Sequence, residues 1–219
     1  MATERTDGRV ERGNQTRRTI LRHTMDVASR EGLEALSLGR IALDLKVSKS
    51  GVFALFGSKE ELQLATVRAA RRVFVDSVVA PAHEAAEGLP RVWRLSEAWL
   101  RYSRERVFAG GCFFQTVVAE FTSRPGAVRD ALRDAEAEWR RHVEELLGRA
   151  RELGHLRPAE DPAQLAFELN ALLTAANRDS LLLDTEAPYA RARAAVRARL
   201  RAASADPALI ERVIRGTAG

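Results

Sequence analysis

The stretch from Ser37 to Leu62 constrains the fold of this chain more than any other part of the sequence. Apolar residues spaced i, i+3, i+4 and i+7 follow Ser37, which is a typical helix N-cap residue. Ser48 is placed to cap a second apolar run that Gly57 ends, and Ser58 begins the pattern of a capping box. Two helices this short cannot bury a core alone, so helices before and after must cover them. The stretch predicts a helix-turn-helix whose second helix can enter a DNA major groove.

The rest of the chain is periodic at helical spacing and shows no strand pattern or repeat, so we expect an all-α fold of about nine to ten helices. The helix that Ser58 begins runs to Pro81 without a break, and should connect the helix-turn-helix rigidly to the C-terminal helices. Outside the opening stretch, helices are expected over residues 16–31, 58–81, 88–109, 112–122, 128–153, 161–183, 188–203 and 207–214.

Charge and composition narrow the class of protein. The net charge of +5 and a pI near 10.1 make a polyanionic partner plausible without establishing one. Cys112 is the single cysteine, which excludes an intramolecular disulfide and fits a reducing compartment. No apolar run is long enough for a membrane span, and the charged N-terminus lacks the apolar segment of a signal peptide. We therefore expect a cytoplasmic protein without a membrane partner.

The first helix and the residues before it are rich in arginine. Residues 1–15 are polar, and are either a disordered terminus or a flexible basic arm that touches the DNA backbone. Arg17 and Arg18 lie in the first turn of the helix expected over 16–31, where they oppose the helix dipole. A nearby phosphate would offset this repulsion, and a solvated face would also explain the two arginines.

Residues 14–62 resemble the DNA-binding domain of the TetR family of one-component bacterial regulators. The resemblance rests on the apolar pattern of residues 20–32, on Ser37-x-x-x-Ile41-Ala42, and on the run VSKSGVF-x-x-F-x-SKEEL over residues 47–62. It covers roughly the first quarter to third of the chain. It implies that Ser37 and Lys59 contact phosphates, and that the second helix of the motif faces the bases. With Arg17, the predicted DNA-binding residues are Ser37, Lys49, Ser50, Gly51, Phe53 and Lys59.

Three positions depart from the family pattern. Phe53 stands where the family usually has tyrosine, Leu55 where histidine is common, and Lys46 where glycine is common in the turn. If Lys46 adopts the left-handed conformation of that turn, the cost is roughly 1 kcal/mol. Because the exposed positions of the second helix are mostly small or apolar, the operator sequence cannot be deduced from them.

The resemblance also implies a C-terminal helical domain that binds an effector and dimerises. We therefore divide the chain into a flexible basic arm (1–15), a helix-turn-helix DNA-binding domain (16–60) and an effector-binding and dimerisation domain (61–219). Cys112 follows two glycines at a helix start, and is a buried structural cysteine, a cavity residue or a sensor of oxidants. The predicted effector-binding residues are Trp99, Tyr102, Cys112, Phe113, Thr116, Phe121 and Trp139.

The last two long helices are the expected dimer surface, since their apolar stripes can form a four-helix bundle with a symmetry mate. Asn170 and Asn177 lie in the first of these helices, where they either fix its register or bind a ligand. The arginines of the second helix suit a solvated face better than a nucleic-acid site. The predicted dimer residues are Leu165, Leu169, Leu172, Ala176, Leu183, Val196 and Leu200.

No metal-ligand spacing, phosphate-binding loop or nucleophile motif occurs, so we expect no enzyme, no cofactor and no metal site. The leading hypothesis is a homodimeric repressor that binds operator DNA and is released by a small hydrophobic effector. A redox-sensing regulator that acts through Cys112 is one alternative. An all-α ligand-binding protein without DNA binding is another, and activation in place of repression stays open.

Overall fold

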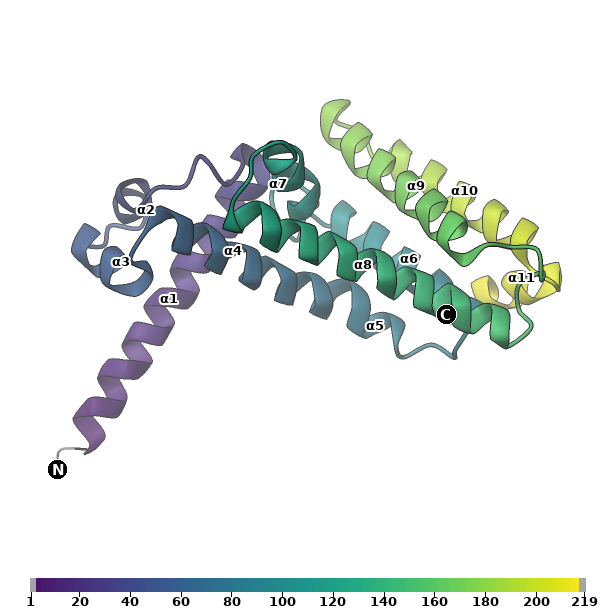
Figure 1. Ribbon diagram of the computed structural model, residues 1–219, viewed down its shortest axis with the longest axis horizontal. Coiled ribbons are helices and arrows are strands. Elements are labelled where there is room, and N and C mark those ends of the chain that lie inside the picture. The colour runs from purple at the N-terminus through teal and green to yellow at the C-terminus, as the bar shows by residue number, and fades with distance from the viewer. Residues whose placement is uncertain (1–2, 217–219) are drawn as a thin grey trace. The chain divides into compact units, whose positions relative to one another are not determined.

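The computed structural model describes residues 3–216, with side chains from Val10 onward, and consists of helices joined by turns (Figure 1). Within these residues no strand forms, and one isolated bridge pairs Leu156 with Ser204. The prediction of an all-α fold is confirmed. The elements are α1 (Thr3–Glu31), α2 (Leu38–Asp44), α3 (Lys49–Phe56), α4 (Lys59–Phe74), the π-helical η1 (Val75–Val79), α5 (Ala80–Ala82), α6 (Leu89–Arg104), α7 (Phe113–Phe121), α8 (Ala127–Glu152), α9 (Pro162–Leu182), α10 (Ala187–Ala203) and α11 (Pro207–Gly216).

Helix α1 begins at Thr3, whereas the sequence analysis expects a flexible arm over 1–15 and a helix start at Thr16. Two glycines but no proline occur over residues 3–15, so nothing in this segment stops the backbone hydrogen-bond ladder. The Oγ1 of Thr16 donates to the carbonyl of Arg12 at 2.9 Å, which places the expected first turn in the middle of a helix. The helix start expected at Thr16 is therefore wrong. The basic arm over 1–15 stays a prediction, and residues 1–2 lie outside the described chain.

The helix expected without a break over 58–81 is interrupted by η1. The N–H of Ala80 donates to the carbonyl of Val75, five residues back, which is the bond of a π-helix. Pro81 has no N–H, and its ring crowds the carbonyl four residues earlier, so the backbone widens ahead of it. The local change of helix type is therefore a consequence of the proline at 81.

By compactness the chain divides into two units, which are described separately. Unit 1 comprises Met1–Arg72 and Phe108–Arg133, and unit 2 comprises Val73–Val107 and Asp134–Gly219. Helix α7 clusters with unit 1 because it packs against α1. The functional limits 1–15, 16–60 and 61–219 stay a prediction, since compactness alone does not show which residues bind DNA or an effector.

Unit 1 is built around α1, which packs against α7 and α2, while α2 packs against α3. Close approach of α1 and the segment before α7 depends on Gly110, whose N–H donates to Ser29 Oγ at 3.0 Å. A Cβ at Gly110 would lie 2.0 Å from the backbone oxygen of Ser29, so only glycine fits there. The buried core of this unit includes Ile20, Val27, Leu33, Leu36, Ile41, Val52, Phe56, Leu62, Phe113 and Val117.

Unit 2 is built around α6, which packs against η1, α5, α9, α10 and α11. Helices α9 and α10 lie side by side (Figure 1). Ser103 Oγ donates to Asn177 Oδ1 at 2.7 Å and also contacts the hydroxyl of Tyr189 at 2.9 Å. Arg106 Nη1 donates to that same hydroxyl at 3.1 Å. These bonds satisfy polar groups buried among α6, α9 and α10, so Asn177 is a structural residue of the unit.

Candidate DNA-binding site and effector region

The helix-turn-helix is held by the caps that the sequence predicts. Ser37 Oγ accepts the N–H of Arg40 at 3.1 Å and begins α2, while Ser48 Oγ accepts the N–H of Gly51 at 3.1 Å and begins α3. Lys46 in the turn has φ +54°, the left-handed conformation that costs a non-glycine residue roughly 1 kcal/mol. The turn geometry is therefore kept although the usual glycine is absent.

Helix α3 buries one face and exposes the other. Val52 and Phe56 are buried and anchor the helix on unit 1. The exposed residues are Ala54 and four of the predicted DNA-binding residues, namely Lys49, Ser50, Gly51 and Phe53, and Phe53 is 58% exposed. A large exposed aromatic side chain on a short helix has no role in the core of unit 1, which makes this face a candidate contact surface.

The two residues for which the resemblance implies phosphate contacts lie at helix starts. Ser37 is exposed at the N-terminus of α2. Lys59 begins α4, and its Nζ donates to the backbone oxygen of Glu34 at 2.8 Å and to Glu34 Oε2 at 2.9 Å. Hydrogen bonds from Lys59 and Gln63 hold the pKa of Glu34 below its ordinary value. The exposed carboxylate of Glu34 thus orients Lys59 at the surface of unit 1.

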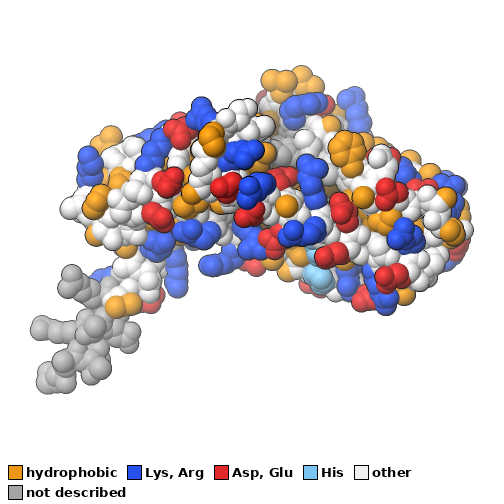
Figure 2. Space-filling model, in the orientation of Figure 1, with side chains coloured by type: hydrophobic (Ala, Val, Ile, Leu, Met, Phe, Trp, Pro, Cys, Tyr) orange, Lys and Arg blue, Asp and Glu red, His pale blue; other side chains and the backbone are white. Residues whose placement is uncertain are grey.

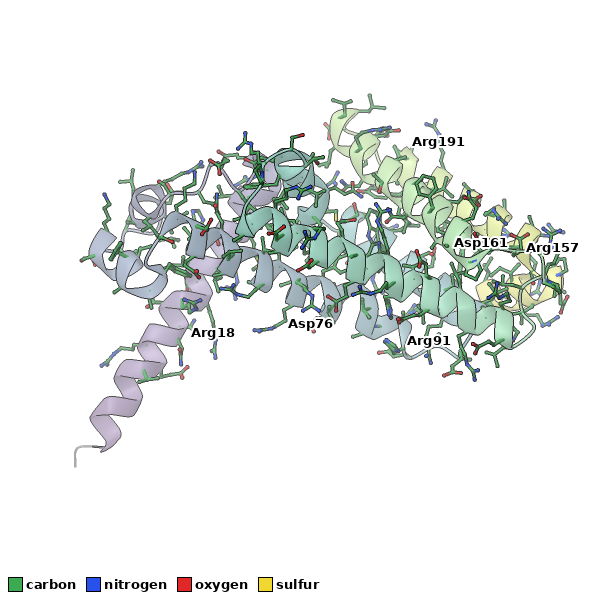
Figure 3. All side chains as sticks on the ribbon, viewed as in Figure 1. Arg18, Asp76, Arg91, Arg157, Asp161 and Arg191 are labelled. Carbon is green, nitrogen blue, oxygen red and sulfur yellow. The ribbon has the colours of Figure 1, made fainter. Side chains whose placement is uncertain are left out.

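Arg17, a predicted phosphate contact, has partners within unit 1. Its Nη1 donates to the backbone oxygen of Leu55 at 2.8 Å, and its guanidinium lies 4.5 Å from the centre of the Phe56 ring. This arginine ties α1 to the end of α3. Arg18 is the more accessible neighbour at 68% side-chain exposure and projects from α1 (Figure 3). Sequence position could not distinguish the two, because both lie in the same turn.

The seven predicted effector-binding residues fall into both units. In unit 2 the rings of Tyr102 and Trp139 each lie edge-on to Phe74, at 5.5 and 5.1 Å between centres, and Trp99 lies 6.5 Å from Tyr102. Phe74 is the member of this aromatic cluster that the sequence analysis missed. In unit 1, α7 and its N-cap carry the other four, of which three are buried and Thr116 is half-buried: Cys112, Phe113, Thr116 and Phe121.

A small internal cavity lies beside one member of the aromatic cluster. Its volume is about 10 Å³, roughly the space that one water needs, and Trp139, Ser96 and Asn170 contribute to its lining. Trp139 Nε1 donates to Asn170 Oδ1 at 3.0 Å, so the indole and the amide satisfy each other. An organic ligand at this place would have to separate the surrounding side chains.

Cys112 is 3% exposed and forms the N-cap of α7. Reaction of a thiol with peroxide or a disulfide requires access to the sulfur. Burial therefore favours the structural interpretation of this cysteine over the redox-sensing alternative.

Most of the predicted dimer residues lie in the core of this chain. The exposed fraction is 0–2% for Leu165, Leu169, Ala176, Val196 and Leu200, which pack where α9, α10 and α6 meet. These five have little surface left for a partner, and the predicted dimer contacts stay a prediction. Leu172 is half-buried and Leu183 is 63% exposed. The outward face of α9 carries Phe167 at 62% and Leu182 at 77% exposure, residues that the apolar spacing did not select.

The arginines of α10 are largely paired with acids. Arg193 Nε donates to both carboxylate oxygens of Glu97 at 2.9 Å, and Arg199 Nη2 donates to Glu160 at 2.8 Å. Arg191 points outward from the helix (Figure 3). On the face shown in Figure 2, basic and acidic side chains are interspersed. The pairing fits a solvated helix face.

Among the side chains that the structure describes, from Val10 to Gly216, no group of three or more metal-ligating residues is arranged to hold a metal ion. In the same described part of the chain, no helix has the length and apolar content needed to cross a membrane.

Solved structures share this fold. A TetR transcriptional regulator from Chloroflexus aurantiacus is 20% identical with a TM-score of 0.79, covering 85% of this chain and 94% of the other. A putative transcriptional regulator from Saccharomonospora viridis, solved with choline, is 24% identical with a TM-score of 0.69, covering 84% and 94%. AibR, solved with isovaleryl coenzyme A and operator DNA, is 19% identical with a TM-score of 0.62, covering 74% and 85%.

Two family models match this chain, one in its N-terminal region and one in its C-terminal region. Residues 20–66 match bacterial regulatory proteins of the tetR family, and residues 88–196 match the tetracyclin repressor-like C-terminal domain. Among curated proteins, none matches the chain. The two matched regions together span more than two thirds of the 219 residues and agree with the helix-turn-helix and the helices after it. The chain belongs to the TetR family of bacterial transcriptional regulators.

Proposed function

We propose that this regulator is a homodimeric repressor that binds a palindromic operator through α3 and is released by a small hydrophobic effector. The observation that carries the proposal is the exposed face of α3, on which Lys49, Ser50, Gly51 and Phe53 lie together above a buried anchor. This is the arrangement of a recognition helix, which places its outer residues in a major groove. The chain would act in the cytoplasm, where bacterial operator DNA lies, and binding rather than catalysis would account for both matched regions.

The proposed effector region is unit 2. The cluster of Phe74, Trp99, Tyr102 and Trp139 supplies apolar and aromatic surface of the kind that lines ligand sites. Two similar structures were solved with small molecules, choline in one and isovaleryl coenzyme A in the other. These ligands differ in charge and size, so they support an effector-binding role without naming the effector of this chain.

The proposed dimer uses the outward face of α9, where Phe167 and Leu182 are exposed. A two-fold axis along this face would bring the same residues of two copies together. Two α3 helices related by that axis would meet successive major grooves, about 34 Å apart along the DNA. An effector that favours a different separation of the two α3 helices would shift the population toward a form that no longer fits the operator.

The direct test is a gel shift of the purified protein with DNA from upstream of its own gene. We expect a salt-sensitive complex with one fragment that persists against competitor DNA. Absence of any complex at low salt, with every upstream fragment, would remove DNA binding from the proposal and favour a ligand-binding protein.

Lys59→Ala is expected to weaken binding to operator and to unrelated DNA by a similar factor, about tenfold at low salt. Loss of one phosphate contact should also reduce the slope of log affinity against log salt concentration by about one. Fluorescence anisotropy at several salt concentrations measures both quantities. Arg151→Ala is the control, because it removes one exposed positive charge from the end of α8. Equal slopes for Lys59→Ala and wild type would remove Lys59 from the phosphate contacts.

A further inference from the structure

The turn that follows α1 is held by a carboxylate from α7. Gly32, at φ +84°, ends α1, and the next two N–H groups point at one side chain. Leu33 N donates to Glu120 Oε2 at 2.7 Å, and Glu34 N donates to Glu120 Oε1 at 3.0 Å. Both oxygens of Glu120 are therefore engaged by the backbone of the turn. Hydrogen bonds to an ionised acceptor are among the stronger ones in proteins.

Gly32 is required for this close approach. A Cβ at residue 32 would lie 2.5 Å from Glu120 Oε2, and the positive φ is itself unfavourable for other residues. Gly32 thus has two roles: its positive φ ends α1, and its missing side chain leaves room for the carboxylate of Glu120. All of these residues belong to unit 1.

One peptide group connects α7 to α4 through this turn. The C=O of Leu33 and the N–H of Glu34 belong to the same trans peptide and point in opposite directions. The N–H donates to Glu120, while the C=O accepts from Gln63 Nε2 at 2.9 Å. Gln63 is 4% exposed, so the bond lies in the interior of unit 1. A donor bond and an acceptor bond on one peptide polarise it in the same sense and strengthen each other.

The same turn orients Lys59. Its Nζ is bonded to the backbone oxygen and to Oε2 of Glu34, and Gln63 Nε2 donates to Glu34 Oε1 at 3.1 Å. Glu120 therefore holds the N–H of Glu34, and the side chain of the same Glu34 positions the ammonium group of Lys59. Ser37, the N-cap of α2, comes three residues later in the chain.

We propose that Glu120 is a positioning residue for operator binding, which fixes the turn of Leu33 and Glu34 and thereby sets Lys59 against the DNA phosphate. The inference rests on the proposed DNA contact of Lys59. It makes α7 the element whose displacement weakens DNA binding, since withdrawal of Glu120 leaves two backbone N–H groups without their acceptor. The chain segment that contains α7 is continuous with unit 2 at Val107–Phe108 and at Arg133–Asp134.

The test is Glu120→Gln in the full chain. The glutamine amide turns one acceptor into a donor that faces a backbone N–H, so we expect operator affinity about tenfold weaker than wild type. Loss of a negative charge alone would strengthen binding to a polyanion, so weaker binding reports lost positioning. Glu84→Gln is the control, because it makes the same charge change at an exposed site of unit 2 and should not weaken operator binding.

A double-mutant cycle with Lys59→Ala identifies the route of the effect. If Glu120 acts through Lys59, Glu120→Gln should change affinity less than about twofold when Lys59 is already alanine. A full tenfold effect in that background, or unchanged affinity in the single variant, overturns the inference. Absence of DNA binding by the wild type would instead count against the proposed function.

Folding of each variant is checked by far-UV circular dichroism. Where Glu120→Gln does not fold, Glu120→Asp decides, because it keeps the charge but is too short to accept both N–H groups. We expect Glu120→Asp to lower affinity several-fold, with the loss removed in the Lys59→Ala background. Wild-type affinity in Glu120→Asp would reject a positioning role for the bidentate contact.

Discussion

Gly110→Ala is expected to destabilise unit 1 by about 3 kcal/mol and to abolish operator binding at concentrations where the wild type is saturated. The added Cβ would lie 2.0 Å from the backbone oxygen of Ser29 and 2.4 Å from its carbonyl carbon. Because the obstacle is backbone, no side-chain rotation relieves it, and the segment before α7 must move away from α1. That movement also breaks the bond from Gly110 N–H to Ser29 Oγ.

Urea unfolding measures the effect with two probes. All three tryptophans, Trp93, Trp99 and Trp139, lie in unit 2, so their fluorescence reports unit 2 while circular dichroism reports helices of both units. We expect the loss of helix signal to begin at lower urea in Gly110→Ala than in wild type. The fluorescence transition shows whether unit 2 is destabilised at the same time.

Gly148→Ala is the matched control for this substitution. Gly148 lies within α8, and a Cβ there would meet nothing within 4 Å. Since alanine is the better helix residue, the control should be stabilised by roughly 0.5–1 kcal/mol. Equal unfolding curves for the two variants would contradict the close approach of Gly110 to α1.

Features that depend on sequence neighbours could be predicted. Ser37 and Ser48 cap their helices, and Gly57 ends α3 at φ +75°. Each of these positions is decided within a few residues, by a side-chain oxygen near orphan N–H groups or by a residue that tolerates positive φ. The left-handed conformation of Lys46, at φ +54°, was raised only through the family resemblance, in which glycine is common at this position.

Which side chain meets which partner depends on distant residues, and the spacing of apolar positions does not contain that information. The apolar stripes with Leu165 on α9 and Leu200 on α10 suit a partner chain or the core of their own chain equally well. The structure buries both residues where α6, α9 and α10 meet. Arg17 finds its acceptor at Leu55, 38 residues away. Glu120 finds the N–H of Leu33 at a separation of 87 residues. No local pattern marks such contacts, so the clustering of α7 with α1 was missed.

Phe167→Glu is expected to convert the proposed dimer into monomers and to lower operator affinity about a hundredfold. Phe167 is 62% exposed on the outward face of α9, where an isologous contact would place two copies of the residue near each other. Two carboxylates buried at one interface repel each other and lose hydration. A monomer meets only one half-site, and so loses the high effective concentration that holds the second α3 helix near its groove.

Sedimentation equilibrium gives the oligomeric state, and anisotropy with the operator gives the affinity. Leu153→Glu is the control, because Leu153 is a 39% exposed leucine that directly follows α8 and is not part of α9. It should remain dimeric and bind the operator as the wild type does. A Phe167→Glu protein that stays dimeric would show that α9 does not pair through this face, and α10 with its exposed alanines would then be the surface to substitute. A monomeric variant with full operator affinity would separate dimerisation from DNA binding, and would require one copy of α3 to supply all of the affinity.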